Sequence, residues 1–258
     1  MANVYLSQDL LQVWRLKELM GSANVEHLDE THPLRLCFDA AQKDLMGLAS
    51  LTAEERERLA YLKLSARAIF SNEAHWKPFE ERFIADLRQT EECKSLLFEL
   101  QVMTFGVGPN VQAMKWRHYA NAAPDIEASV PDMLVECKLV RSDKLFRIEG
   151  KLEEGRRQHG GLDVPYVIAV GFDHYFSRAE IEDALALAND LKPWFLAHPD
   201  VAAGLIFMPA DPCTASAQPV HNPLGLVGTV ALHGGITELI HHKATHPLPA
   251  GFSFNPSA

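Results

Sequence analysis

Two carboxylates and a lysine between residues 125 and 138 have the types and the spacing of a site that cleaves phosphodiester bonds with a metal ion. Glu136 and Lys138 stand two residues apart at the end of an apolar run, so on a strand both side chains point to one face. Burying such a pair is costly unless each charge has a partner. Asp125, eleven residues before Glu136, adds a second carboxylate. Carboxylate oxygens are the ligands that Mg²⁺ prefers, and a lysine can orient or deprotonate an attacking water.

Two short strands are expected to position these groups. Residues 125–130 and 133–140 have strand character and are joined by a tight turn at Pro131-Asp132. If the two strands pair as a hairpin, Asp125 falls near Glu136 and Lys138. The Cys137 side chain then points to the opposite face, while its main-chain carbonyl is placed to serve as a further metal ligand. Without a metal, carboxylates this close would repel, and at least one should have a raised pKa.

Two neighbouring carboxylates compete for the same role. Asp132 suits the turn between the strands and is assigned to structure. Glu127 lies two residues after Asp125 and shares its face, which makes it a lesser ligand candidate.

The rest of the chain supplies the elements around this hairpin. From about Thr90 the expected order is α-β-β-β-α-β, followed by α-β. The predicted elements are a helix through Leu96 and Met103 that stops at Gly106 and Gly108, a strand over 111–119, the hairpin, a helix over 146–159, a strand over 164–172, a helix from the capping box at Ser177 through Leu191, a strand over 203–208 and a further strand around 226–232.

The first third is predicted to be helical. The predicted helices are one near residues 10–20 ending at Gly21, one opened by the capping box Thr52-Ala53-Glu54-Glu55 and running through Ile69, and one over 76–88. The domains expected are therefore a helical region (1–89), an α/β core (90–240) and an irregular tail (241–258). The helical region carries no recognisable chemistry and suits packing, a homodimer interface or a protein partner.

Pro124-Asp125 followed by Glu136-Cys137-Lys138 resembles the PD-(D/E)xK nuclease superfamily, whose fold is the restriction-endonuclease-like fold. The resemblance covers roughly residues 90–172, and the αβββαβ order is similar to the family's core. It implies an α/β core with a mixed sheet. The family's early helix often carries a metal-associated glutamate, and Glu99 matches that position. Arg156 and Gln158 resemble a polar pair that the family places near the phosphate.

The resemblance implies a mechanism in which Asp125 and Glu136 bind one or two Mg²⁺ (or Mn²⁺) ions, with Glu99 and the Cys137 carbonyl as further ligands. The metal would polarise the phosphate and lower the pKa of a bound water. Lys138 would orient or deprotonate that water and offset developing negative charge.

Composition limits the function classes. The 258 residues are 47% hydrophobic, which is enough for a sizeable core, and no apolar run approaches the roughly 18 residues of a membrane span. Four scattered cysteines and the absence of a signal-like N-terminus favour a cytoplasmic protein with reduced thiols. The net charge of −10 opposes nucleic-acid binding through global electrostatics. Residues 138–157 nevertheless hold seven basic against four acidic side chains, which is either a local basic face or a mixed solvated helix.

The sequence thus predicts a Mg²⁺-dependent nuclease acting on DNA. The alternative is a catalytically inert module of the same fold that binds nucleic acid or a protein. Fold alone does not separate the two, whereas the combination of Asp125, Glu136 and Lys138 favours an enzyme.

Overall fold

The computed structural model describes residues 8–46, 51–106, 114–120, 124–129, 132–142, 144–158, 163–172, 184–209, 227–232 and 235–241. The chain divides into two compact units, Met1–Gln101 and Val102–Ala258. Each unit is described by itself.

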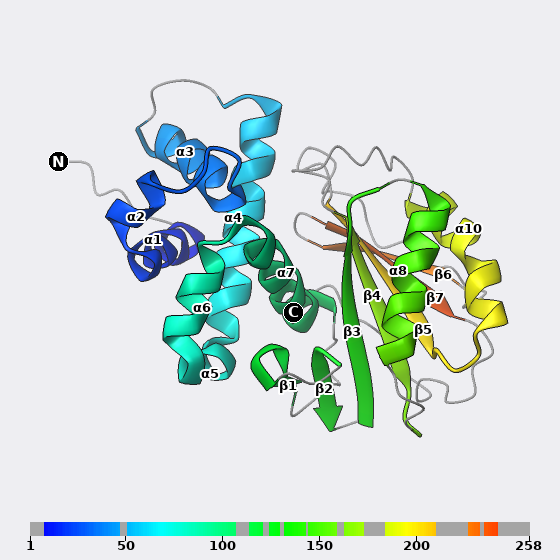
Figure 1. Ribbon diagram of the computed structural model, residues 1–258. Helices are drawn as coiled ribbons and strands as arrows, with labels where there is room; N and C mark the ends of the chain where they lie inside the picture. The colour runs from blue at the N-terminus through cyan, green and yellow to red at the C-terminus, as the bar shows by residue number, and fades with distance from the viewer. Residues whose placement is uncertain are drawn as a thin grey trace. The chain divides into compact units, whose positions relative to one another are not determined.

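The first unit is helical, as predicted (Figure 1). Its elements are α1 (Gln8–Met20), α2 (Ser22–Glu26), α3 (Pro33–Met46), α4 (Ala53–Ser71), α5 (Glu73–Trp76), the 3-10 helix η1 (Lys77–Phe79), α6 (Glu80–Leu87) and α7 (Thr90–Gln101). Among the described residues, no helix combines the length and the apolar character that crossing a bilayer requires.

Both helix-end signals in this unit are confirmed. Gly21 follows α1 with φ 78°, a left-handed conformation that glycine adopts without a Cβ penalty. At the start of α4, Glu55 N–H donates to Thr52 Oγ1 at 3.2 Å, and Thr52 N–H donates to Glu55 Oε2 at 2.9 Å. This is the reciprocal pairing of a capping box.

The boundary between the units differs from the predicted one at 89/90. The helix α7 belongs to the first unit, because Asn72 donates to the Leu100 carbonyl at 3.5 Å and Gln101 donates to Ser65 at 3.2 Å. A π-helical turn over residues 102–106 follows α7 and opens the second unit.

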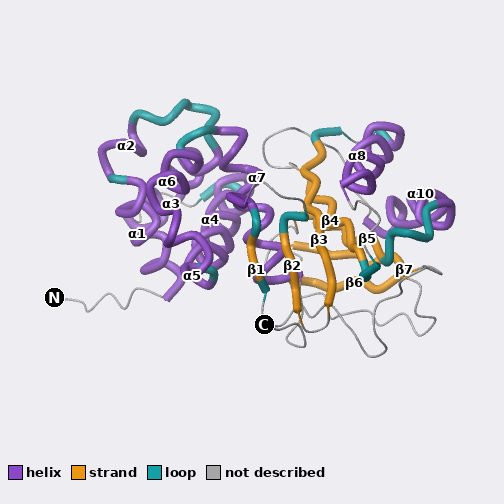
Figure 2. The backbone as a smooth tube through the Cα atoms, turned by 60° about the horizontal axis from the view of Figure 1, so that its bottom comes forward, coloured by secondary structure: helices purple, strands orange, loops and turns teal. Residues whose placement is uncertain are grey.

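The second unit is built on one mixed seven-stranded sheet with the order β1-β2-β3-β4-β5-β7-β6 (Figure 2). The strands are β1 (Lys115–Trp116), β2 (Ile126–Ser129), β3 (Asp132–Val140), β4 (Tyr166–Phe172), β5 (Ala203–Pro209), β6 (Val227–Leu232) and β7 (Gly235–His241). The pairs β3–β4 and β4–β5 are parallel, and every other pair is antiparallel. The sheet therefore confirms the α/β class and its mixed character.

Two helices lie side by side on one face of this sheet: α8 (Leu145–Gln158) against β3 and β4, and α10 (Ala184–Ala197) against β5 and β7 (Figures 1 and 2). Their inner faces pack with the even-numbered residues of β3 and β4 into one core. Its buried members include Leu134, Val140, Ile148, Leu152, Tyr166, Ile168, Val170, Leu191, Trp194 and Phe195.

Most predicted elements of this unit are present with shifted ends. Of the strand predicted over 111–119, residues 114–119 are described, and they hold the two residues of β1 followed by the start of a 3-10 turn over His118–Ala120. The strand β7 was not predicted. The helix α10 continues to Ala197 through Pro193, whereas the prediction ended at Leu191. Ser177 and residues 242–258 of the predicted tail lie outside the described residues.

Gly204 and Gly150 give opposite predictions for the same substitution. A Cβ at Gly204 would lie 2.3 Å from Phe195 Cζ, while a Cβ at Gly150 meets nothing within 4 Å. Gly204→Ala should therefore destabilise by about 1–3 kcal/mol through overpacking. Gly150→Ala, inside α8, should stabilise by about 0.5–1 kcal/mol. Urea denaturation of both variants measures the difference, and equal midpoints would contradict the packing of α10 on β5.

Candidate active site

The strand register brings Asp125 and Glu136 face to face. The last β2–β3 pair is Ile126 with Val135, so one further step places Asp125 opposite Glu136 with both side chains on the same face. The main chain of β3 holds the Asp125 carboxylate at this position, because Cys137 N–H donates to Asp125 Oδ2 at 2.8 Å. The hairpin predicted from the sequence is confirmed.

Glu136 lies beneath α8. Only 2% of it is exposed. A Cβ on Gly155 would lie 3.5 Å from Glu136 Cγ, so the glycine leaves the helix backbone close to the carboxylate. The same turn of α8 is attached to the sheet by Tyr166, whose hydroxyl donates to the Gly155 carbonyl at 2.8 Å.

Lys138 supplies the positive charge of the site. Its Nζ donates to Glu136 Oε1 at 2.6 Å and lies 3.8 Å from Glu154 Oε1 on α8. The Lys138 side chain is 11% exposed, so the ion pair is almost entirely removed from water. The spacing of two on one strand produces this pair, as predicted.

The pKa values of these groups are perturbed. Burial raises the pKa of Asp125, although the Cys137 amide, the Lys138 charge and a hydrogen bond with Glu136 oppose the change. A raised carboxyl pKa was predicted, but its main cause is loss of water rather than repulsion between carboxylates. For Lys138, burial lowers the pKa, and the charge and hydrogen bond of Glu136, with Asp125 and Glu154, outweigh it, so the pKa is raised overall.

The donor set suits a hard divalent cation held by few protein ligands. Among the described residues there is no group of three or more His, Cys, Asp or Glu side chains placed to hold a metal. Asp125 and Glu136 are two carboxylates, and Mg²⁺ commonly uses one or two, with waters completing its shell. Since the N–H and C=O of one strand residue point to the same side, the Cys137 carbonyl is directed toward Asp125, beyond the last β2–β3 pair. These residues fit Mg²⁺ better than a zinc site, which takes four tightly held ligands.

Glu99 is placed in the first unit. It lies on α7, 5% exposed, among buried residues of that helix such as Leu96 and Leu100. The site of the second unit is therefore built from its own residues, and a role for Glu99 as a ligand stays a prediction.

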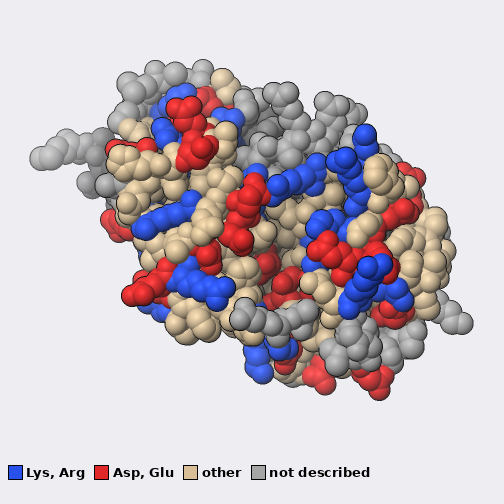
Figure 3. Space-filling view, viewed as in Figure 1, with Lys and Arg blue, Asp and Glu red and all other residues tan. Residues whose placement is uncertain are grey.

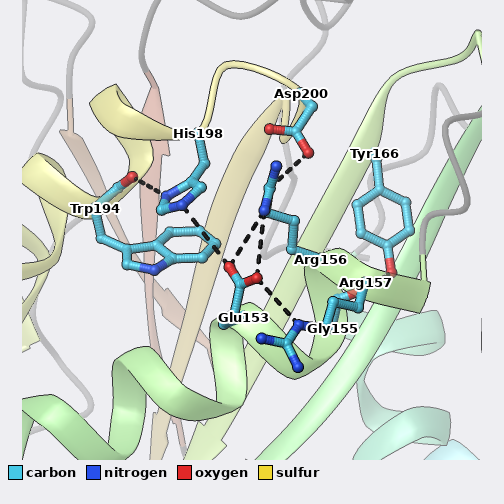
Figure 4. Close-up of polar contacts among 8 residues, drawn as sticks. All are labelled: Glu153, Gly155, Arg156, Arg157, Tyr166, Trp194, His198 and Asp200. Atoms are coloured by element: carbon cyan, nitrogen blue, oxygen red, sulfur yellow. Dashed lines mark hydrogen bonds and ion pairs between the residues drawn. The ribbon is translucent and has the colours of Figure 1, made fainter.

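Arg156 and Gln158 lie on different sides of α8. Arg156 Nε donates to Asp200 Oδ2 at 2.7 Å, and its NH1 nitrogen lies 3.3 Å from Glu153 Oε1 (Figure 4). Two carboxylates thus fix this guanidinium to the loop after α10. Gln158 is exposed in the last turn. The structure therefore gives Arg156 two carboxylate partners, and a phosphate contact of Arg156 or Gln158 stays a prediction.

The sequence did not point to two basic residues beside the site, Lys115 in β1 and Arg117 directly after it. Lys115 lies opposite Glu127 in the β1–β2 pair. Two residues further along, Arg117 lies opposite Asp125, and its backbone N–H donates to the Asp125 carbonyl at 2.8 Å. The Arg117 side chain donates to Glu127 Oε2 at 2.9 Å. Glu127 is therefore paired with a cation, and its lesser candidacy as a metal ligand stays a prediction. The alternation of Lys115, Trp116 and Arg117 was the available signal.

Comparison of the chain with family models, with curated proteins and with solved structures finds no match. The function is therefore inferred from the residues of the site.

Removing the cation from the buried pair should destabilise the second unit. Lys138→Met leaves Glu136 and Asp125 without their ammonium partner, at an expected cost of about 3–5 kcal/mol. Replacing both members, as Glu136→Leu with Lys138→Met, should recover most of that loss because no buried charge of the pair remains. Calorimetric unfolding of both variants tests this, and a double variant no more stable than Lys138→Met would contradict it.

Proposed function

We propose that this chain is a divalent-metal-dependent nuclease that hydrolyses phosphodiester bonds, with DNA as its substrate. The observation that carries the proposal is the juxtaposition of Asp125 and Glu136 across the β2–β3 pair, with the Lys138 ammonium 2.6 Å from Glu136. A structural ion pair needs only one carboxylate, whereas here the Cys137 N–H holds a second carboxylate, that of Asp125, beside the pair.

Asp125, Glu136 and the Cys137 carbonyl would hold Mg²⁺ or Mn²⁺. When bound, the metal polarises the phosphate and lowers the pKa of a coordinated water.

The chain's own groups then position the reacting atoms. The Lys138 ammonium is hydrogen-bonded to Glu136 and lies 3.8 Å from Glu154, so it is held beside the carboxylates of the site. It would orient the attacking water and offset the charge that develops on the phosphate oxygens. Arg117, next to Asp125, is a candidate contact for a neighbouring phosphate.

The element order α7-β1-β2-β3-α8-β4 supports a restriction-endonuclease-like core for this protein. The alternative is a catalytically inert module that binds nucleic acid or a protein. A buried ion pair alone is compatible with that function as well.

Cleavage assays separate the two functions. Purified protein is incubated with plasmid, single-stranded DNA and RNA in Mg²⁺, Mn²⁺ or EDTA. Metal-dependent cleavage is expected, and Asp125→Asn, Glu136→Gln and Lys138→Ala should each lower its rate by about 10²–10⁴-fold, since each removes a charge at the reacting centre.

Asp132→Asn is the matched control, because it removes a carboxylate from the exposed start of β3, four residues from Glu136. It should leave cleavage unchanged. Cleavage that persists in all three site variants would refute the assignment of the site. Absence of both cleavage and metal binding by calorimetry would favour the binding module.

A further inference from the structure

The charged residues of α8 are sorted onto two sides of the helix. The buried stripe is Ile148, Leu152 and Gly155. On one side of it lie residues spaced by three and four, the spacing of a helix face, namely Lys144, Arg147, Lys151, Glu154 and Gln158. On the other side lie Glu149, Glu153 and Arg156. The first of these sides is called the basic flank below.

The basic flank is the side next to the candidate site. Glu154, its fourth member, lies 3.8 Å from Lys138 and 2.7 Å from Lys151. Since α8 covers β3 and β4, this side of the helix faces the part of the sheet that carries β2 and β1. Lys144, Arg147 and Lys151 therefore form a row of cations that leads to the Asp125–Glu136 pair.

The opposite side of α8 is occupied by structural contacts. Glu153 pairs with Arg156 and Arg157 and lies 3.8 Å from His198 (Figure 4). His198 Nδ1 in turn forms a 2.7 Å hydrogen bond with the Trp194 carbonyl. The imidazole ring of His198 lies against the Trp194 ring, with 4.2 Å between the two centroids. These contacts join α8 to α10 and account for the second side without any ligand.

Comparable contacts do not account for the first two members of the basic flank. Within the described part of the chain, neither Lys144 nor Arg147 forms an ion pair, and both are exposed. Figure 3 shows Lys and Arg side chains, in blue, gathered near the beginning of α8. In a chain of net charge −10, two exposed cations with no ion pair to a described residue, next to Lys151, are a local reversal of sign.

We infer that the basic flank of α8 binds the phosphate backbone of a nucleic acid and leads it to the carboxylate site. The inference rests on the proposed function for what happens at the site, but the binding it describes does not require cleavage. Lys115 of β1 and Arg117, the residue after the end of β1, lie on the sheet face of Asp125 from the other side and pair with Glu127. The carboxylates of the site therefore lie between two sets of cations. A negatively charged strand is the partner that such an arrangement attracts.

Binding is measured in EDTA by fluorescence anisotropy, with labelled single-stranded DNA, duplex DNA and RNA, over a series of salt concentrations. The variants are Arg147→Ala and the triple variant Lys144→Ala, Arg147→Ala and Lys151→Ala. The triple variant should bind about 10–100-fold more weakly near 0.1 M salt. Its slope of log affinity against log salt should fall by roughly 2–3, about one for each lost phosphate contact.

Arg157→Ala is the matched control for Arg147→Ala, since it removes the same charge from the same helix on the side tied to Glu153. It should leave affinity and salt slope close to wild type. Equal weakening by the two single variants would overturn the inference in favour of a nonspecific charge effect, as would a triple variant that binds like wild type. Binding that depends on the flank in a protein that never cleaves would refute the proposed function while leaving this surface standing.

Discussion

The burial of the Glu136–Lys138 ion pair is the constraint on which the rest of the second unit depends. A carboxylate that is 2% exposed is stable only if its desolvation is offset by close partners. The ammonium of Lys138 at 2.6 Å is one such partner. The arrangement requires α8 to pack closely over the carboxylate, as it does at Gly155, and requires strand β3 to hold residues 136 and 138 on one face.

The same constraint explains why α8 carries two kinds of charge. One side of the helix meets Lys138 through Glu154, and the other meets the loop after α10 through Arg156 and Asp200. Ion pairs exposed to water contribute little stability individually, but these ones fix the rotation of the helix about its axis. Once the rotation is fixed, the direction of every other side chain on α8 follows. The exposed cations on the side of Lys138 are therefore placed by the buried pair.

Much of this site could be predicted from the sequence because it is local. Asp125, Glu136 and Lys138 lie within fourteen residues of one another on a hairpin, and strand alternation decides which face they share. The roles of Arg156 and Arg117 could not be predicted, because Asp200 and Glu127 become their partners only through contacts between elements. Likewise α10 passes through Pro193, which favours a helix end, because Leu191, Trp194 and Phe195 are buried on both sides of it. Pro193 disfavours a continuing helix in the local sequence, and packing overrides this preference.

The overall acidity of the chain does not conflict with a nucleic-acid substrate once the charges are located. At physiological ionic strength, exposed charges more than about 8–10 Å apart are largely screened from one another. A phosphate at the site therefore responds to the charges next to it far more than to acidic residues elsewhere in the chain. The two carboxylates of the site itself remain the main repulsion at that point, and burial already raises the pKa of Asp125 there. A divalent cation between Asp125 and Glu136 would remove that repulsion, so metal binding and approach of a phosphate should favour each other.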